Sequence, residues 1–149
     1  MDAEFKIIKN QIKLRKHLDS ITRSILIDAA QINVKDIKKG LDQGKGPKGK
    51  LQKLKAKTVK QKQKKGYATP SKPLIATGMM RRLPPIKVSQ DKVTISVANK
   101  RAKIAQYHDK GGSTQKNPPK RPWFDIYPET IRKVNRLVKK RLVKLYARL

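Results

Sequence analysis

Apolar residues near the start of the chain recur at the spacing of a helix. Mostly Lys, Arg and Gln stand between them, and intervals of seven, four and three place the apolar side chains on one face. The apolar positions are Ile7, Leu14, Leu18, Ile21, Ile25 and Ala29. We therefore predict an amphipathic helix from Asp2 to about Ala30, followed by a short apolar stretch that ends at Gly40.

The C-terminal segment has a similar pattern. Steps of three and four residues separate its apolar positions, and basic residues fill the other faces. Pro128 suits the first turn of a helix, and Glu129 suits the positive end of the helix dipole. The pattern predicts a long helix from Pro128 to Leu149. The apolar positions are Ile131, Val134, Val138, Leu142, Leu145 and Leu149.

Strict alternation of apolar and polar residues predicts one β-hairpin at about 85–98. Its two runs are separated by Ser89–Lys92, and its single apolar face requires helices to cover it. The alternating positions are Ile86, Val88, Val93, Ile95 and Val97. We also predict a short helix within 72–83. The whole chain, 1–149, is expected to form a single α+β domain, in which a long N-terminal and a long C-terminal helix pack a small antiparallel sheet.

Lysine dominates the segment 44–72, which has eleven lysines and no acidic residue. So many like charges with few apolar anchors predict a long loop over 41–72 that is mobile when the protein is unassembled. Its lysines are our candidates for contact with DNA or an acidic partner. They are Lys45, Lys48, Lys50, Lys53, Lys55, Lys57, Lys60, Lys62, Lys64 and Lys65.

The composition gives the chain a strongly positive net charge. Thirty-nine Lys and Arg against ten Asp and Glu give a net charge of +29 over 149 residues, which attracts polyanions and repels like molecules. Nucleic acid, acidic protein surfaces and anionic membranes are the natural partners of such a chain. The absence of cysteine excludes a disulfide framework, and two separated histidines do not supply a zinc site. We expect no cofactor, no signal peptide and no membrane span.

The sequence gives little support for a catalytic site. His108 and Asp109 are adjacent and could form an acid–base pair, but no nucleophile or second carboxylate stands near them in sequence. A histidine that hydrogen-bonds within a turn is the favoured interpretation. The glycines of GKGPKGK, at 44–50, lack the spacing of a phosphate-binding loop. We therefore expect a protein that is not an enzyme.

The segment 118–124 has the residue types of an interface. Its prolines stiffen the backbone, and its Arg, Trp and Phe are typical anchors between proteins. Phe124 is expected to fill the chain's own core, whereas Trp123 could do this or anchor another subunit. The candidate docking residues are His108, Gly111, Arg121, Pro122, Trp123 and Phe124.

The order of several short motifs resembles a known family. LQKLKAKTVKQKQKKG is followed by KPLIATGMMRRL, DKVTISVA, IAQYHDKGG, PPKRPWFDI and a terminal helix. This order, from about Leu51 to the C-terminus, is similar to the tail-completion and virion-morphogenesis proteins of tailed bacteriophages, which include tail terminators and neck proteins. Ile104 is aligned with a position where an aromatic residue is common in the family, Lys120 replaces a small residue, and Met79–Met80 replaces the usual apolar pair. The matching positions are Leu54, Thr58, Lys62, Pro73, Leu74, Thr77, Gly78, Ile104, Ala105, His108, Gly111, Pro119, Arg121, Pro122 and Phe124.

The resemblance implies a small subunit of a homo-oligomeric ring at the head–tail junction of the virion. Such a ring would be assembled in the host cytoplasm, contact neck, connector or tail-tube proteins, and have DNA in its lumen. It would not contact membranes. The alternative from charge alone is a free cytoplasmic nucleic-acid-binding protein of the ribosomal or nucleoid type.

Overall fold

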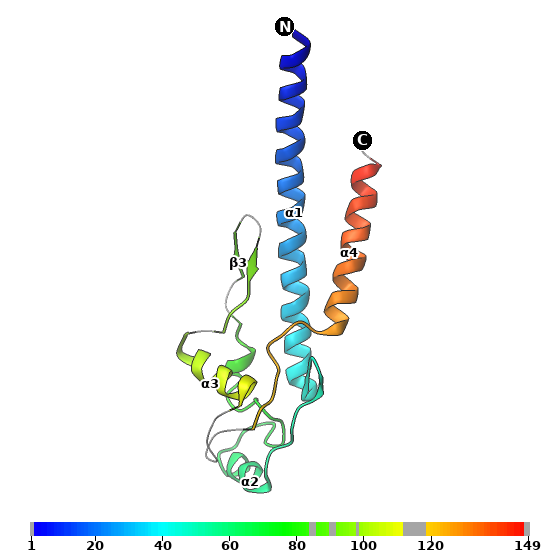
Figure 1. The fold of residues 1–149 in the computed structure, drawn as a ribbon. Coiled ribbons are helices and arrows are strands. Elements are labelled where there is room, and N and C mark those ends of the chain that lie inside the picture. Colours follow the sequence, from blue (N-terminus) through cyan, green and yellow to red (C-terminus); the bar gives the residue numbers. More distant parts are fainter. Residues whose placement is uncertain (1, 84–85, 90–91, 98, 112–118, 148–149) are drawn as a thin grey trace.

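The computed structural model describes residues 2–83, 86–89, 92–97, 99–111 and 119–147, with side chains described from Asp19 onward except at 99–101. Over these ranges the fold is α+β, with four α-helices and two antiparallel two-stranded sheets. Long helices stand at both ends of the chain, as the sequence predicts (Figure 1). No helix of the described part is long and apolar enough to cross a membrane.

The N-terminal helix α1 (Asp2–Gln43) continues well beyond the predicted end near Ala30, so that boundary was wrong. Ala30, Ile37 and Leu41 follow one another at steps of seven and four and are all buried, which extends the helical pattern. Gly44, with φ of 64°, is the residue that ends the helix, since its N–H bonds to the carbonyl of Leu41 at 3.1 Å.

Gly40 therefore lies inside α1, where its lack of a side chain allows other segments of the chain to approach the helix closely. A Cβ atom at this position would collide with the hydroxyl and ring of Tyr127 and would lie 2.8 Å from the carbonyl oxygen of Lys45. The missing side chain lets two distant segments reach the surface of α1.

The C-terminal helix α4 (Pro128–Tyr146) runs antiparallel to α1 (Figure 1). The Thr130 hydroxyl donates to the buried carboxylate of Asp36 at 2.7 Å, and Lys133 also contacts that carboxylate. Closer to the free ends, Arg141 pairs with Asp28 at 2.8 Å. These contacts fix both the direction and the rotation of α4.

The rotation of α4 differs from the one that its apolar stripe predicts. Thr130 is buried at the contact, whereas the side chains of Ile131 and Leu142 are 53% and 43% exposed. Hydrogen bonds and ion pairs to two α1 carboxylates turn the helix, so part of the apolar stripe faces solvent.

The segment predicted as a loop over 41–72 contains regular elements. Strands β1 (Lys45–Gly46) and β2 (Gly49–Lys50) form a short hairpin, and helix α2 (Ala56–Lys64) follows. Buried Leu51 ties this segment to the core. These elements interrupt the loop that was predicted over 41–72, and its mobility in the unassembled protein stays a prediction. Within 72–83 the predicted helix is one 3-10 turn, η1 (Met79–Arg81).

The predicted β-hairpin is present. Strands β3 (Lys87–Val88) and β4 (Val93–Thr94) pair antiparallel, with Val88 opposite Val93. Both valines are partly buried, and Lys87 and Thr94 are exposed, so the alternation is confirmed. Helix α3 (Asn99–Lys110) follows where the sequence pattern predicted only a turn.

The core lies where the end of α1 meets α3, η1 and the segment before α4. Trp123, Ile37 and Leu41 are its largest fully buried side chains, and the Trp123 and Phe124 rings meet edge to face at 5.3 Å. The remaining buried members of the core are Leu51, Met80, Ala105 and Tyr127. The members of this cluster come from α1, α3, η1 and the segments that connect the helices.

Trp123→Ala should lower the free energy of unfolding by about 3–5 kcal/mol, because it removes the largest side chain of the core and leaves a cavity. Urea denaturation would measure the loss. Tyr146→Ala is the matched surface control, because its side chain is 74% exposed, and it should change stability by less than about 0.5 kcal/mol. Equal effects of the two substitutions would contradict this placement of the core.

Tyr127 should make stability depend on alkaline pH. Burial, and then the charge of Asp36, raise its pKa to about 12 from the ordinary value of 10.0. Below pH 10 the phenol is protonated in both states, so its full contribution is present. Between pH 10 and 12 the unfolded chain ionises first, and that contribution is lost. The stability difference between wild type and Tyr127→Phe, from urea titrations, should shrink above pH 10; a constant difference would contradict the assignment.

Candidate functional site

The two halves of the predicted docking region contact each other within the chain. The Asp109 carboxylate, at the end of α3, accepts hydrogen bonds from the backbone N–H groups of Trp123 at 3.0 Å and Phe124 at 3.2 Å. The N–H of Arg121 donates to the carbonyl of His108 at 2.6 Å. The end of α3 thus holds the extended segment 121–124 in place, and Asp109 is its backbone acceptor.

Arg121 is a core residue and not an exposed anchor. Its side chain is 3% exposed, and its guanidinium donates to the carbonyls of Gln52 at 2.8 Å and Lys53 at 3.4 Å. Burial lowers the pKa of Arg121. Trp123 is fully buried, so the interpretation of these two residues as docking contacts was wrong. Both face inward because the Asp109 contacts turn the segment toward the core.

The other docking candidates also make contacts inside the chain. Gly111, with φ of 77°, ends α3, and its N–H bonds to the carbonyl of Tyr107 at 2.9 Å. A Cβ on Gly46 would collide with the carbonyl of Pro122, so these two backbones touch. Phe124 is partly buried against the core. A docking role for His108, Gly111, Pro122 and Phe124 stays a prediction.

His108 is half-buried between α3 and the interior. Its Nδ1 atom is buried and has no hydrogen-bond partner in the described part of the chain. Burial, and then the charge of Arg121, lower the pKa of His108 from 6.5, which keeps the imidazole neutral at neutral pH. An uncharged ring beside a buried guanidinium avoids repulsion between like charges.

A cavity of about 220 Å³ opens between α2, the segment 74–80 and α3. Its walls combine apolar side chains with the polar groups of Thr58, Lys62 and His108. Eight of the positions that carry the phage-family resemblance line it, although they come from three separate motifs. They are Leu54, Thr58, Lys62, Leu74, Thr77, Gly78, Ile104 and His108.

Lys62 closes one side of this cavity. Its ammonium donates to the carbonyls of Lys72 at 2.7 Å and Thr69 at 3.4 Å, and it also contacts the carbonyl of Ile75. Burial lowers the pKa of Lys62. Lys62 was therefore wrongly grouped with the lysines that face a partner. Its contacts surround Leu74, whose φ of 63° places a non-glycine residue in the strained left-handed region.

The other nine candidate lysines are exposed, and their contact with DNA or acidic partners stays a prediction. They are spread over β1, β2, the segment before α2, α2 itself and its end, so no single element aligns them. They are Lys45, Lys48, Lys50, Lys53, Lys55, Lys57, Lys60, Lys64 and Lys65.

Two further surfaces were missed by the sequence analysis. The α4 patch consists of Leu142, Val143 and Tyr146, whose side chains are 43%, 68% and 74% exposed. The α3 patch consists of Ile104 and Tyr107, at 39% and 52%. Neither patch could be predicted from the sequence, because the rotation of α4 and the formation of α3 depend on tertiary contacts.

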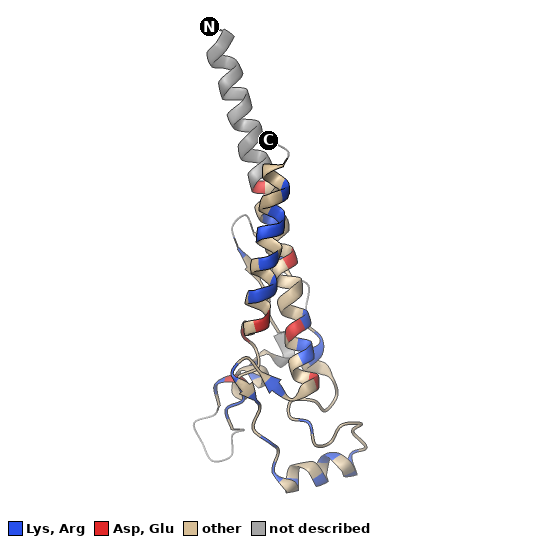
Figure 2. Cartoon of the chain, turned by 90° about the vertical axis from the view of Figure 1, so that its right-hand side faces the viewer, with Lys and Arg blue, Asp and Glu red and all other residues tan. Residues whose placement is uncertain are grey.

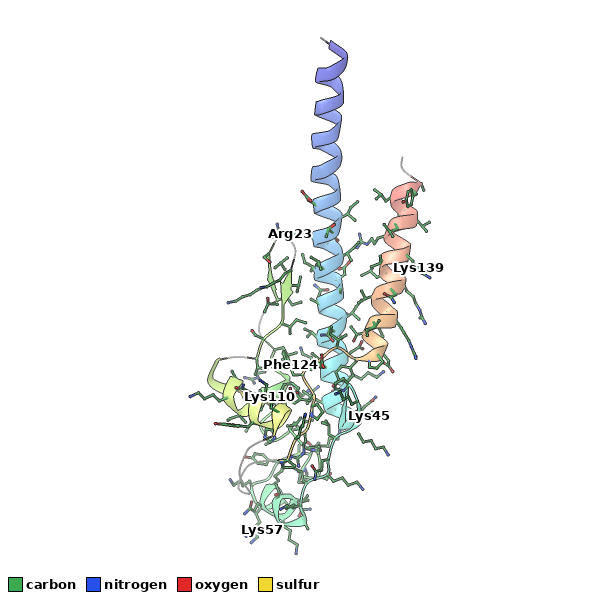
Figure 3. The ribbon with its side chains drawn as sticks, in the orientation of Figure 1. Arg23, Lys45, Lys57, Lys110, Phe124 and Lys139 are labelled. Atoms are coloured by element: carbon green, nitrogen blue, oxygen red, sulfur yellow. The ribbon has the colours of Figure 1, made fainter. Side chains whose placement is uncertain are left out.

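The third missed surface is the basic row of α4, which consists of Arg132, Arg136, Lys140 and Lys144. Figure 2 shows Lys and Arg along the side of this helix that faces the viewer. In Figure 3, long side chains of α4 extend away from α1. The signal was present in the sequence, since the four residues stand four positions apart.

Comparisons with known protein families, curated proteins and solved structures found no match to this chain.

Lys62→Met should loosen the segment 69–75, because it removes the only ammonium that contacts its carbonyls among the described residues. Amide hydrogen exchange there should accelerate, and global stability should fall by about 1–3 kcal/mol, the cost of losing bonds to a charged donor. Lys64→Met is the matched control, since Lys64 is exposed on the same helix. Unchanged exchange in 69–75 would contradict this role.

Proposed function

We propose that this chain is a non-enzymatic structural protein of a tailed bacteriophage, which forms a homo-oligomeric ring at the head–tail junction. In this role, as a tail-terminator, tail-completion or neck protein, it joins the tail to the head and surrounds the DNA channel. The main observation behind the proposal is that one subunit exposes two different apolar patches, the α4 patch and the α3 patch.

The arrangement of the two patches favours a ring. The α4 patch and the α3 patch belong to helices that lie on opposite sides of α1 (Figure 1). A head-to-tail interface joins two different surfaces of the same chain, and repetition of that contact gives a ring when the rotation between neighbouring copies closes. Tyr107 and Tyr146 are large exposed aromatics of the kind enriched at interfaces. A second copy therefore supplies the complementary surface to each patch.

The phage assignment draws on the order of the sequence motifs. Positions from the first, second and fourth of these motifs, separated by as many as 54 residues, line the cavity between α2 and α3. A shared cavity is a physical reason for these motifs to occur together, because each contributes one wall. This supports treating them as one structural unit and not as unrelated short matches.

Single substitutions on each patch test the ring. Leu142→Glu removes the α4 patch and Tyr107→Glu removes the α3 patch, so each variant alone should be monomeric by native mass spectrometry. Mixed together, each variant still has the patch that the other lacks, and the mixture should form heterodimers but no ring. A wild-type chain that stays monomeric at all concentrations would contradict the ring.

Particle composition tests the location. Quantitative mass spectrometry of purified phage particles should find a fixed, small number of copies for each portal assembly, because rings follow rotational symmetry. Absence of the chain from particles, together with a monomeric wild type, would favour the free nucleic-acid-binding protein instead.

A further inference from the structure

The basic row of α4 has a regular geometry. Arg132, Arg136, Lys140 and Lys144 are all exposed, and each lies beside the next because residues four apart are neighbours on a helix surface. Each step also turns by about 40° around the axis, so the row winds around about a third of the helix. Each step advances about 6 Å along the axis, so the row extends over about 18 Å. A single rigid helix thus holds four cations at a constant pitch.

Nothing within the described chain neutralises this row. The acidic partners of α4 lie elsewhere: Asp28 pairs with Arg141, and Asp36 pairs with Lys133. Glu129, the single acid of the helix, contacts Lys39 and Lys133 near the first turn. None of the four row residues makes an ion pair among the described residues. Like charges four apart repel each other by a few tenths of a kcal/mol, and a bound polyanion removes that penalty.

We infer that the basic row of α4 binds the phosphate backbone of double-stranded DNA without sequence preference. This deepens the proposed function, on which it rests for the presence of DNA. A duplex strand carries one phosphate for about every 3.4 Å of axis, so about five phosphates of one strand lie within the length of the row. A regular row of cations suits a regular polyanion better than the irregular carboxylates of a protein surface.

The neighbouring surface favours a duplex over a single strand. Single-strand binders combine cations with aromatic side chains on which bases stack. The row contains no aromatic residue, and Tyr146, the aromatic of α4, lies on the apolar patch two positions beyond Lys144. The row can therefore contact the phosphates through its charges, and such contacts carry no information about the base sequence.

Charge-matched variants test this inference in the full-length chain. One replaces Arg132, Arg136, Lys140 and Lys144 with Gln, and the control replaces Lys53, Lys55, Lys57 and Lys60 with Gln. Gln preserves helix propensity, and each variant loses four charges. Fluorescence anisotropy with a labelled mixed-sequence duplex, titrated with salt, reports the affinity and its salt dependence.

The row variant should bind duplex DNA at least about tenfold more weakly than the control. The slope of log K against log salt should fall by about 3 to 4, since each lost phosphate contact removes about 0.9. Equal weakening of both variants would overturn the inference, because it would show that overall charge decides binding. Displacement of the duplex by poly-L-glutamate or anionic phospholipid vesicles at equal charge would also overturn it.

The failure of this inference can be separated from failure of the ring. The row variant is weighed by native mass spectrometry alongside the binding assay, and it should assemble like wild type because the two apolar patches are unchanged. The same four Gln substitutions are also compared in the Leu142→Glu background. If wild type forms no ring, the binding difference in that background still decides whether the row contacts DNA.

Discussion

The pair of hydrogen bonds from Trp123 and Phe124 to the Asp109 carboxylate is the contact on which the rest of the structure depends. It places Trp123 in the core beside the end of α1. One turn further on, the Tyr127 hydroxyl lies 3.2 Å from the carbonyl of Trp123, and its ring rests against Gly40. Thr130 then reaches Asp36 and sets the direction of α4. A carboxylate at the end of one helix therefore orients another helix.

The scarcity of acidic residues shapes how buried cations are accommodated. Arg121 and Lys62 bond to backbone carbonyls and not to carboxylates. Two of the ten acids, Asp28 and Asp36, lie instead at the contact between α1 and α4, where they neutralise one side of α4. The remaining sides of α4 carry exposed basic residues or exposed apolar residues. One side of α4 thus serves the fold, and its other sides are available to the second copy and the DNA that we propose as partners.

Local patterns predict the elements of this fold better than their packing. The long terminal helices and the alternating hairpin have clear periodicity, and both are present. The course of α1 past Ala30 was missed because the residues up to Gly40 were interpreted as a separate apolar stretch, whereas Gly40 lies inside the helix and is needed for the approach of Tyr127. The regions around His108 and Arg121 were both predicted to dock onto other proteins, whereas in the structure they contact each other. The location of this contact inside the chain depends on Asp109, whose partners are 14 and 15 residues away.

The antiparallel arrangement of α1 and α4 has a consequence for synthesis. Asp28 and Arg141, which pair in the native state, are 113 residues apart. At about 5–20 residues per second, the ribosome makes Arg141 roughly 6–20 s after Asp28. Throughout that interval α1 is exposed without the helix that covers it. Until both helices have been made, the apolar face of α1 is available to chaperones or to other nascent copies.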